Sequence, residues 1–195
     1  MQDERMETIV RHILASGARR VLDLGCGEGE LLLRLAGQAQ LEQLTGLDID
    51  PACVDTARQA LERTAARAGP CVEVRQGSFT EPDPSLQGFD IAALIETIEH
   101  IDPRHLSRLE DAVFGCMRPG TVLVTTPNQE YNQLYGLAPG EMRHPGHFFE
   151  WTRARFRKWG WGVAARHGYR VQFVDLGELD PARGGSSQMA RFTRQ

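Results

Sequence analysis

Several features that would assign the chain to a special class are missing from its 195 residues. It has no repeats and no apolar run that approaches the roughly 20 residues needed to cross a bilayer. The first residues, Met1-Gln2-Asp3-Glu4-Arg5, lack the basic start and apolar core of a signal peptide. Four scattered cysteines, Cys26, Cys53, Cys71 and Cys116, show no Cys-x-x-Cys spacing. We therefore expect free thiols, a cytoplasmic protein and no membrane partner.

The composition is that of an ordinary globular domain. Hydrophobic residues make up 41% and charged residues 25% of the chain, and the length suffices for a sizeable core. We expect one domain over residues 1–195. The net charge of −4 conceals a basic segment, residues 141–170, which holds seven Lys or Arg and two Glu. Such a segment is either a surface that holds a polyanion or a solvated helix face.

Strand and helix patterns alternate along the chain. They predict strands over 19–24, 44–48, 72–76, 89–95, 121–126, 169–176 and 188–193, and helices over 6–15, 30–35, 51–68, 103–116 and 153–166. Alternation indicates a parallel sheet covered on both faces, and the last two strands, with no helix between them, predict an antiparallel hairpin. A long loop, 127–150, remains. Seven strands with this ending resemble the α/β, Rossmann-like fold of class I S-adenosylmethionine-dependent methyltransferases.

A glycine-rich loop joins the first predicted strand to the following helix. It reads Asp23-Leu-Gly25-Cys-Gly27-Glu-Gly29. Glycines let a backbone approach a ligand closely, and a helix start offers free N–H groups. The dinucleotide fingerprint would need glycine at position 30, which is Glu, and a P-loop would need a following Gly-Lys-Ser/Thr. The loop resembles motif I of S-adenosylmethionine-dependent methyltransferases, in which the carboxylate suits the cationic amino-acid end of the cofactor.

That resemblance extends the cofactor site to other strand ends. Asp48 ends the second predicted strand, where a carboxylate can accept both ribose hydroxyls. Ile49 would lie against the adenine, Ser78 and Phe79 would contact it, and Ile95 would complete the site. The alternative is a strand–loop–helix junction whose glycines serve only for turning.

Acidic and imidazole side chains gather after the fourth predicted strand. Glu96, Glu99 and His100 fall within five residues, and their spacing places them on one side of a helical turn. Clustered carboxylates with a nitrogen ligand suit Mg²⁺ or Mn²⁺. His144 and His147 of the long loop could supply a fourth ligand. The alternative is a solvated acidic turn that the loop histidines never meet.

Three segments together resemble the small-RNA 3′-terminal 2′-O-methyltransferase family. They are Glu96-Thr-Ile-Glu99-His100, Thr126-Pro-Asn128-Gln-Glu130-Tyr-Asn132 and His147-Phe-Phe-Glu150-Trp151-Thr152-Arg153. The resemblance implies that Glu96, Glu99, His100 and His147 hold the metal and form the catalytic centre. His144 remains a candidate for proton transfer or for supporting a ligand. Gly146 and Phe148 depart from the family pattern, because an acidic and a basic residue often occupy these places.

The resemblance implies methyl transfer from S-adenosylmethionine to the 2′-OH of the 3′-terminal ribose of an RNA. Candidate substrate contacts are Asn128, Arg143, His144, Arg153, Arg155, Arg157 and Lys158. A bacterial branch of the family acts in RNA repair beside a polynucleotide kinase-phosphatase-ligase, through a region that this chain lacks. Two alternatives stay open: a metal-independent methyltransferase of small molecules, and a non-catalytic module that binds RNA ends or a partner.

Overall fold

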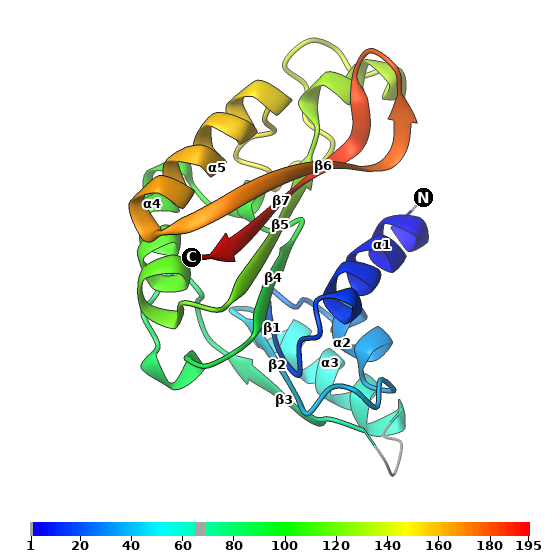
Figure 1. Ribbon diagram of the computed structural model, residues 1–195. Coiled ribbons are helices and arrows are strands. Elements are labelled where there is room, and N and C mark those ends of the chain that lie inside the picture. The colour runs from blue at the N-terminus through cyan, green and yellow to red at the C-terminus, as the bar shows by residue number, and fades with distance from the viewer. Residues whose placement is uncertain (1, 65–68) are drawn as a thin grey trace.

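A single seven-stranded sheet forms the centre of the computed structural model, which describes residues 2–64 and 69–195. The strands are β1 (Arg20–Leu24), β2 (Gln43–Asp48), β3 (Cys71–Gln76), β4 (Ile91–Ile95), β5 (Thr121–Pro127), β6 (Tyr169–Asp180) and β7 (Gly184–Arg194). Their order across the sheet is β3-β2-β1-β4-β5-β7-β6 (Figure 1). β7 pairs antiparallel with both of its neighbours, and the other pairs are parallel. The predicted fold, including the C-terminal hairpin, is confirmed.

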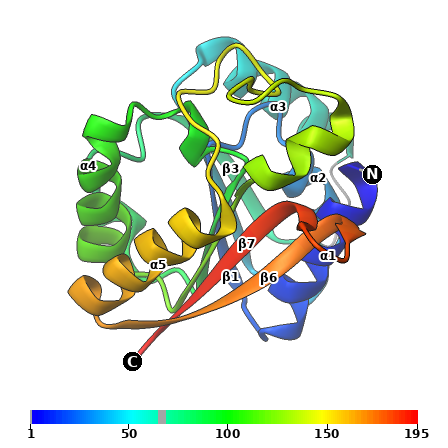
Figure 2. The same ribbon diagram turned by 90° about the horizontal axis from the view of Figure 1, so that it is seen from above.

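Helices cover both faces of the sheet, as the two ribbon views show (Figures 1 and 2). α1 (Gln2–Ala15), α2 (Glu30–Leu35) and α3 (Pro51–Thr64) lie on one side, and α4 (Leu106–Glu110) and α5 (Arg153–His167) on the other. Successive strand residues point to opposite faces. Accordingly, Leu22 packs in the core beneath α4 and α5, whereas Val21 packs in the core beneath the first three helices. Strands buried on both faces explain the nearly continuous apolar runs in the sequence.

Most predicted boundaries agree with the structure to within a few residues, and the differences have physical causes. α1 begins four residues before the predicted start, at Gln2. β6 continues to Asp180 and β7 begins at Gly184, because the ladder resumes beyond an irregularity between Leu176 and Leu179. The polar and glycine-rich sequence there carries no strand signal of its own. The predicted end of α3, near Ala68, lies outside the described residues.

The helix predicted after Pro103 is divided into three consecutive helical segments of different type. A 3₁₀ turn, η3 (Pro103–His105), leads into α4, and a π-helical segment, η4 (Asp111–Met117), follows. Arg118 ends the segment in the left-handed region at φ 48°. All four cysteines are free thiols, as predicted.

The predicted long loop contains ordered structure. A 3₁₀ segment, η5 (Gln129–Tyr135), follows β5. Another 3₁₀ segment, η1 (Pro84–Leu86), lies outside this loop, between β3 and β4. Asn128 anchors the start of the loop to the hairpin, because its buried amide nitrogen donates to the carbonyls of Arg183 and Gly185, both at 2.8 Å. The loop ends where Thr152 caps α5 by accepting a hydrogen bond from the Arg155 N–H. Gly168 ends α5 at φ 74°, as predicted.

Candidate functional site

A cavity of about 580 Å³ opens beside the carboxyl ends of the parallel strands. Predicted cofactor and metal residues line it: Gly25, Asp48, Ile49, Ser78, Phe79, Glu96 and His100. Other lining residues were not predicted, among them Thr97, His105 and Arg108 from the segments that follow β4. Asp23, Gly27, Ile95, Glu99 and His147, which were also predicted for the cofactor or metal site, do not line this cavity. The carboxyl edge of a parallel sheet is where ligands bind in open α/β folds.

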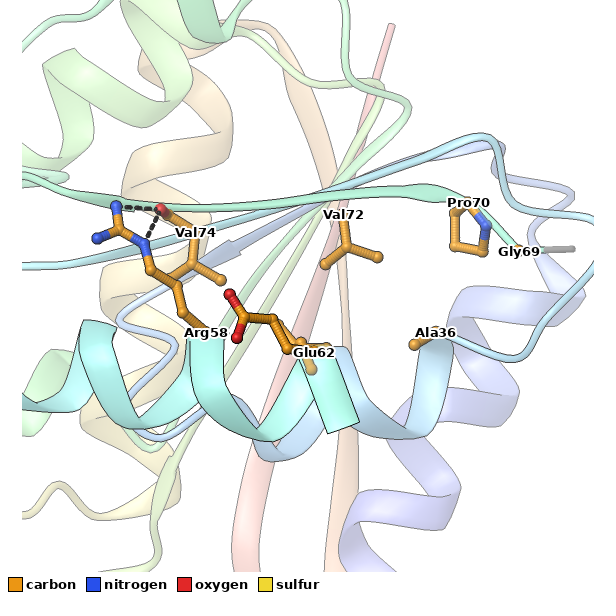
Figure 3. Close-up of a pocket in the computed structure, with 8 residues that line it drawn as sticks. Ala36, Arg58, Glu62, Gly69, Pro70, Val72 and Val74 are labelled. Carbon is orange, nitrogen blue, oxygen red and sulfur yellow. Dashed lines mark hydrogen bonds between the residues drawn. The ribbon is translucent and has the colours of Figure 1, made fainter. Parts of the chain in front are cut away.

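A second cavity, of about 300 Å³, lies between α3 and the edge strand β3 (Figure 3). Its wall is formed largely by aliphatic side chains, and the Arg58 guanidinium turns to the Val74 carbonyl through hydrogen bonds of 3.1 and 2.8 Å. None of the residues predicted to bind cofactor, metal or RNA lines it. The cavity at the carboxyl edge is therefore the candidate site.

The glycine-rich loop closes one end of the site. Gly25 has φ 79°, and a Cβ on it would meet the Thr97 side chain at 2.6 Å. Gly27 also has a positive φ, and its N–H donates to Asp48 Oδ2 at 2.8 Å. Asp48 Oδ1 accepts the Asp50 N–H at 2.9 Å. Each carboxylate oxygen keeps acceptor capacity, so Asp48 is still able to accept ribose hydroxyls.

Asp23 is buried at the start of this loop. Burial, with the nearby charge of Asp48 adding to it, raises the pKa of Asp23 to about 7. A buried carboxylate next to another one favours a bound cation. The α-ammonium group of S-adenosylmethionine is such a cation, and the residues therefore fit the predicted cofactor.

Glu96 adopts an unusual backbone conformation at the end of β4. Its φ is 50°, rare for a residue other than glycine, and such outliers concentrate at functional sites. Its N–H donates to the Thr125 hydroxyl at 3.0 Å, and that hydroxyl donates to Glu96 Oε1 at 2.9 Å. Ser187 donates to Oε2 at 3.4 Å, and the Arg5 guanidinium from α1 lies 3.4 Å from the same oxygen.

Glu99 is fully buried on η2 (Ile98–His100), one turn after Glu96. The Thr126 hydroxyl donates to its Oε2 at 3.0 Å, but its Oε1 is buried with no hydrogen-bond partner in the described structure. Burial, together with the charge of Glu96, raises the pKa of Glu99 well above its usual range. An unpartnered buried carboxylate oxygen beside a second carboxylate is the arrangement that a divalent cation would compensate.

Three histidines meet next to these carboxylates. Ring nitrogens of His100, His144 and His147 lie within 4.8 Å of one another, so the loop histidines do reach the turn after β4. In the part of the chain that the structure describes, Glu96 and Glu99 do not belong to this close group. Burial lowers the pKa of His100, and the nearby imidazoles of His147 and His144 lower it further. Neutral imidazoles are the form that binds metals.

Hydrogen bonds distinguish the three rings. His100 Nδ1 contacts the Gly146 carbonyl at 3.1 Å, and His147 Nδ1 contacts Glu150 Oε1 at 2.6 Å. Because both partners are acceptors, both Nδ1 atoms carry the hydrogen, which leaves each Nε2 lone pair free for a cation. His144 Nδ1 instead accepts the Gly146 N–H at 3.0 Å, so its neutral ring is protonated at Nε2. His144 is thereby set apart from the other two as a donor.

The departure from the family pattern at Gly146 has a structural counterpart. Its N–H and carbonyl each bond to a different histidine. A Cβ at this position would approach His144 Nδ1 to 3.0 Å and His100 Nδ1 to 3.4 Å. The absent side chain permits the close approach of these two rings.

A buried carboxylate supports His147. Glu150 accepts three hydrogen bonds: from His147 Nδ1, from the Arg143 N–H at 2.7 Å, and from Asn132 Nδ2 at 2.5 Å. Arg143 Nε in turn donates to Asn132 Oδ1 at 2.6 Å. The network fixes the His147 ring and the loop that carries it.

The predicted substrate contacts are largely engaged within the protein. The remaining Arg143 donors bond to the carbonyls of Ser186 and Asn128, and Arg153 pairs with both oxygens of Glu130. Arg155 and Arg157 lie over the rings of Trp151 and Phe173. Arg108, which sequence reasoning missed, lines the cavity, and within residues 2–64 and 69–195 its guanidinium has no hydrogen bond or ion pair. Only its place on the helix after β4 could have signalled it.

The fold and this site define a class I methyltransferase, and comparison with known proteins agrees. A family model described as "Methyltransferase domain" matches residues 21–120. The crystal structure of the methyltransferase domain of bacterial CtHen1-CN superposes with a TM-score of 0.87 at 37% identity, with 98% of each chain covered.

Other solved and curated proteins are also similar to the chain. The small RNA methyltransferase HEN1 structure has a TM-score of 0.90 at 32% identity and covers 100% of this chain and 26% of that one. The Small RNA 2′-O-methyltransferase of Xenopus tropicalis is 35% identical over 100% of this chain and 55% of its own length. The chain belongs to the methyltransferase-domain family and, within it, to the branch of the small RNA 2′-O-methyltransferases.

The chain spans about half, or less, of the length of these curated relatives. The family supports S-adenosylmethionine as the predicted cofactor. In the described part of the chain, every helix is too short or too polar to cross a membrane.

Proposed function

We propose that this chain is a methyltransferase domain, residues 1–195, that transfers the methyl group of S-adenosylmethionine to the 2′-OH of the 3′-terminal ribose of an RNA. The carrying observation is that one cavity is lined both by the cofactor set, Gly25 and Asp48, and by Glu96 and His100. A cofactor and the group it modifies must share such a space for direct transfer. The related proteins named as small RNA 2′-O-methyltransferases supply the substrate class.

The proposal includes a divalent cation, Mn²⁺ or Mg²⁺, held by Glu96, Glu99, His100 and His147. The unpartnered Glu99 Oε1 and the two free Nε2 lone pairs fit it. Such a cation supplies Lewis acidity, which lowers the pKa of the 2′-OH, and a template for the two vicinal hydroxyls. His144, whose ring lies next to that of His147 and whose Nδ1 accepts the Gly146 N–H, would donate through Nε2–H to an acceptor oxygen of the RNA end.

The chain's own residues would do the remaining work. Asp23 would hold the ammonium group of the cofactor and Asp48 its ribose. Thr125 and Thr126 hold the two glutamates in place through their hydroxyls. Arg108 would contact a phosphate near the terminal nucleotide. Assembly with a polynucleotide kinase-phosphatase-ligase repair partner, and a cytoplasmic location, remain predictions from the sequence.

The test is transfer of a labelled methyl group to short RNAs with different 3′ ends. We expect methylation of an end with 2′-OH and 3′-OH in Mn²⁺, and none with a 2′-deoxy or a 3′-phosphate end, because chelation needs both hydroxyls. Glu99→Gln should retain S-adenosylmethionine binding and lose transfer. Efficient transfer beside a 3′-phosphate would refute the two-hydroxyl model, and full activity of Glu99→Gln in chelator would remove the cation from the mechanism. Methylation of small metabolites alone would favour a metal-independent small-molecule enzyme.

A further inference from the structure

Phe148 is a large aromatic side chain that the fold leaves outside its core. Its side chain is 58% exposed, whereas the next residue, Phe149, is 7% exposed and stacks on Trp151 with ring centroids 4.2 Å apart. A single exposed aromatic residue is ordinary in itself. Phe148 is a candidate ligand contact because it lines the candidate cavity together with Glu96 and His100.

The backbone around Phe148 is held in place. Its N–H donates to the Glu99 carbonyl at 2.8 Å, and the preceding N–H, of His147, donates to the His144 carbonyl at 3.1 Å. Phe148 therefore follows one candidate cation ligand directly and is bonded to the main chain of another. The fixed main chain presents the ring at a defined place, and an aromatic side chain has only about two rotatable bonds to immobilise when a ligand covers it.

The proposed substrate presents a suitable partner for this ring. If the terminal ribose hydroxyls face Glu96 and His100, the base attached to that ribose must lie within a few ångströms of the cavity wall. Proteins recognise single-stranded ends by stacking unpaired bases on aromatic side chains.

We propose that Phe148 is a stacking surface for the 3′-terminal base of the RNA, independent of which base it is. This inference rests on the proposed function. Stacking accepts every base because each has a π-face, so Phe148 would strengthen end binding without selecting a sequence. The adenine of the cofactor is the other group that could stack on Phe148. However, Ile49, Ser78 and Phe79 line the same cavity and are the residues expected to contact the adenine.

The experiment compares Phe148→Ala and Phe148→Trp with the parent protein. Two RNAs are used, one intact and one abasic at its 3′-terminal nucleotide. We expect Phe148→Ala to raise KM for intact RNA roughly tenfold, from the strength of base–aromatic stacking, with kcat nearly unchanged. On abasic RNA, parent and Phe148→Ala should have equal KM, and Phe148→Trp should restore KM for intact RNA. The matched control is Trp161→Ala, which removes a ring of similar exposure, 59%, on α5 outside the cavity and should have no effect.

A binding readout separates this inference from the proposed function. Fluorescence of 2-aminopurine at the 3′ end should be quenched by the parent and by Phe148→Trp, and much less by Phe148→Ala. An equal KM rise on intact and abasic RNA, no rise at all, or weaker S-adenosylmethionine binding in Phe148→Ala would overturn the role of Phe148. If the parent binds RNA ends without methylating them, the proposed function fails. The difference in 2-aminopurine quenching between the parent and Phe148→Ala would then still show whether Phe148 stacks on the terminal base. If the parent binds no RNA end, both fail.

Discussion

The guanidinium of Arg5, in the first helix, lies 3.4 Å from Oε2 of Glu96, the residue that directly follows β4. The same Arg5 nitrogen donates to Ser187 Oγ at 3.1 Å. Both members of the pair are only 21% exposed, so the charges interact in a partly desolvated setting. A carboxylate proposed to hold a divalent cation therefore already has a protein cation beside it, and the two cations compete.

Replacing Arg5 by alanine should tighten Mn²⁺ binding. Removing a positive charge next to Glu96 is expected to strengthen binding roughly fivefold, or by about 1 kcal/mol. Manganese titration followed by electron paramagnetic resonance measures this. Arg19→Ala is the control, because it breaks an exposed ion pair, the one between Arg19 and Glu42. It should not change Mn²⁺ affinity. Weaker Mn²⁺ binding by Arg5→Ala would mean that Arg5 orders Glu96 instead of competing for it.

Glu150→Gln should weaken Mn²⁺ binding, although residue 150 is not one of the proposed ligands of the ion. Three donors converge on this carboxylate, and an amide would turn an N–H₂ toward one of them. Loss of a partner that orients a ligand typically lowers metal affinity by about 10–100-fold. We also expect about 1–3 kcal/mol lower stability, measured by thermal unfolding. Glu130→Gln breaks the Arg153 pair and should cost stability alone. Equal Mn²⁺ affinity in Glu150→Gln and the parent would contradict the role of Glu150.

S-adenosylmethionine binding should depend on pH through Asp23. The raised pKa of about 7 means that the free protein holds a proton on Asp23 below neutrality. If the ammonium group needs the ionised carboxylate, Kd should rise roughly tenfold per pH unit below 7. Calorimetry from pH 8 to pH 6 measures it, and Asp23→Asn should bind weakly and without that pH dependence. A flat profile for the parent would show that Asp23 does not titrate on binding.

The same pKa makes a prediction about stability with the opposite sign. An unfolded aspartate titrates near 4, so between about pH 4 and 7 the folded protein holds one more proton than the unfolded chain. The stability that protonated Asp23 contributes is fully present below about pH 4 and is lost as the pH rises to about 7. Asp23→Asn should therefore be more stable than the parent at pH 7.5, with a smaller difference at pH 5. Denaturant unfolding at the two pH values measures it, and equal stabilities at pH 7.5 would count against the raised pKa.

Arg108→Ala should weaken RNA binding and lower its salt dependence. Arg108 lines the cavity, and its guanidinium has no partner among the described residues, so it could contact a phosphate. Losing one such contact should reduce the slope of log K against log salt by about 0.7 for a single strand. Arg153→Ala should leave the slope unchanged, because its donors bond to Glu130 and to the Ala182 carbonyl. Equal slopes for Arg108→Ala and the parent would remove Arg108 from the RNA site.

The sequence predicted the sheet and the approximate place of the candidate site well. Alternating apolar strands, the Gly25–Gly27 loop and Asp48 are local signals, and the parallel topology brings their strand ends to one edge. The family resemblance implied that His147 reaches the turn after β4, and its ring lies close to that of His100. Spacing alone left open whether the loop histidines meet this turn.

Contacts across large sequence distances could not be predicted. Arg143 and Arg153 belong to a basic segment, and only the folded chain reveals that their donors are used within the protein. Arg5 reaches Glu96 because α1 packs on the sheet, and no local pattern encodes that. The positive φ of Glu96 is equally invisible in a sequence where glycine is the usual signal for it.

Two main-chain contacts join the loop to the turn after β4: the Phe148 N–H bonds to the Glu99 carbonyl, and the Gly146 carbonyl bonds to His100 Nδ1. Both contacts involve protein groups alone, so they do not depend on a bound ion. We therefore expect that chelation leaves the fold intact and that an ion held by the proposed ligands exchanges by simple dissociation. Removal of the ion would then lower the unfolding temperature only by the mass action of its binding. If the proposed cation takes part in the reaction, activity would follow the free manganese or magnesium concentration reversibly. Removing the ion and adding it back would restore activity without refolding.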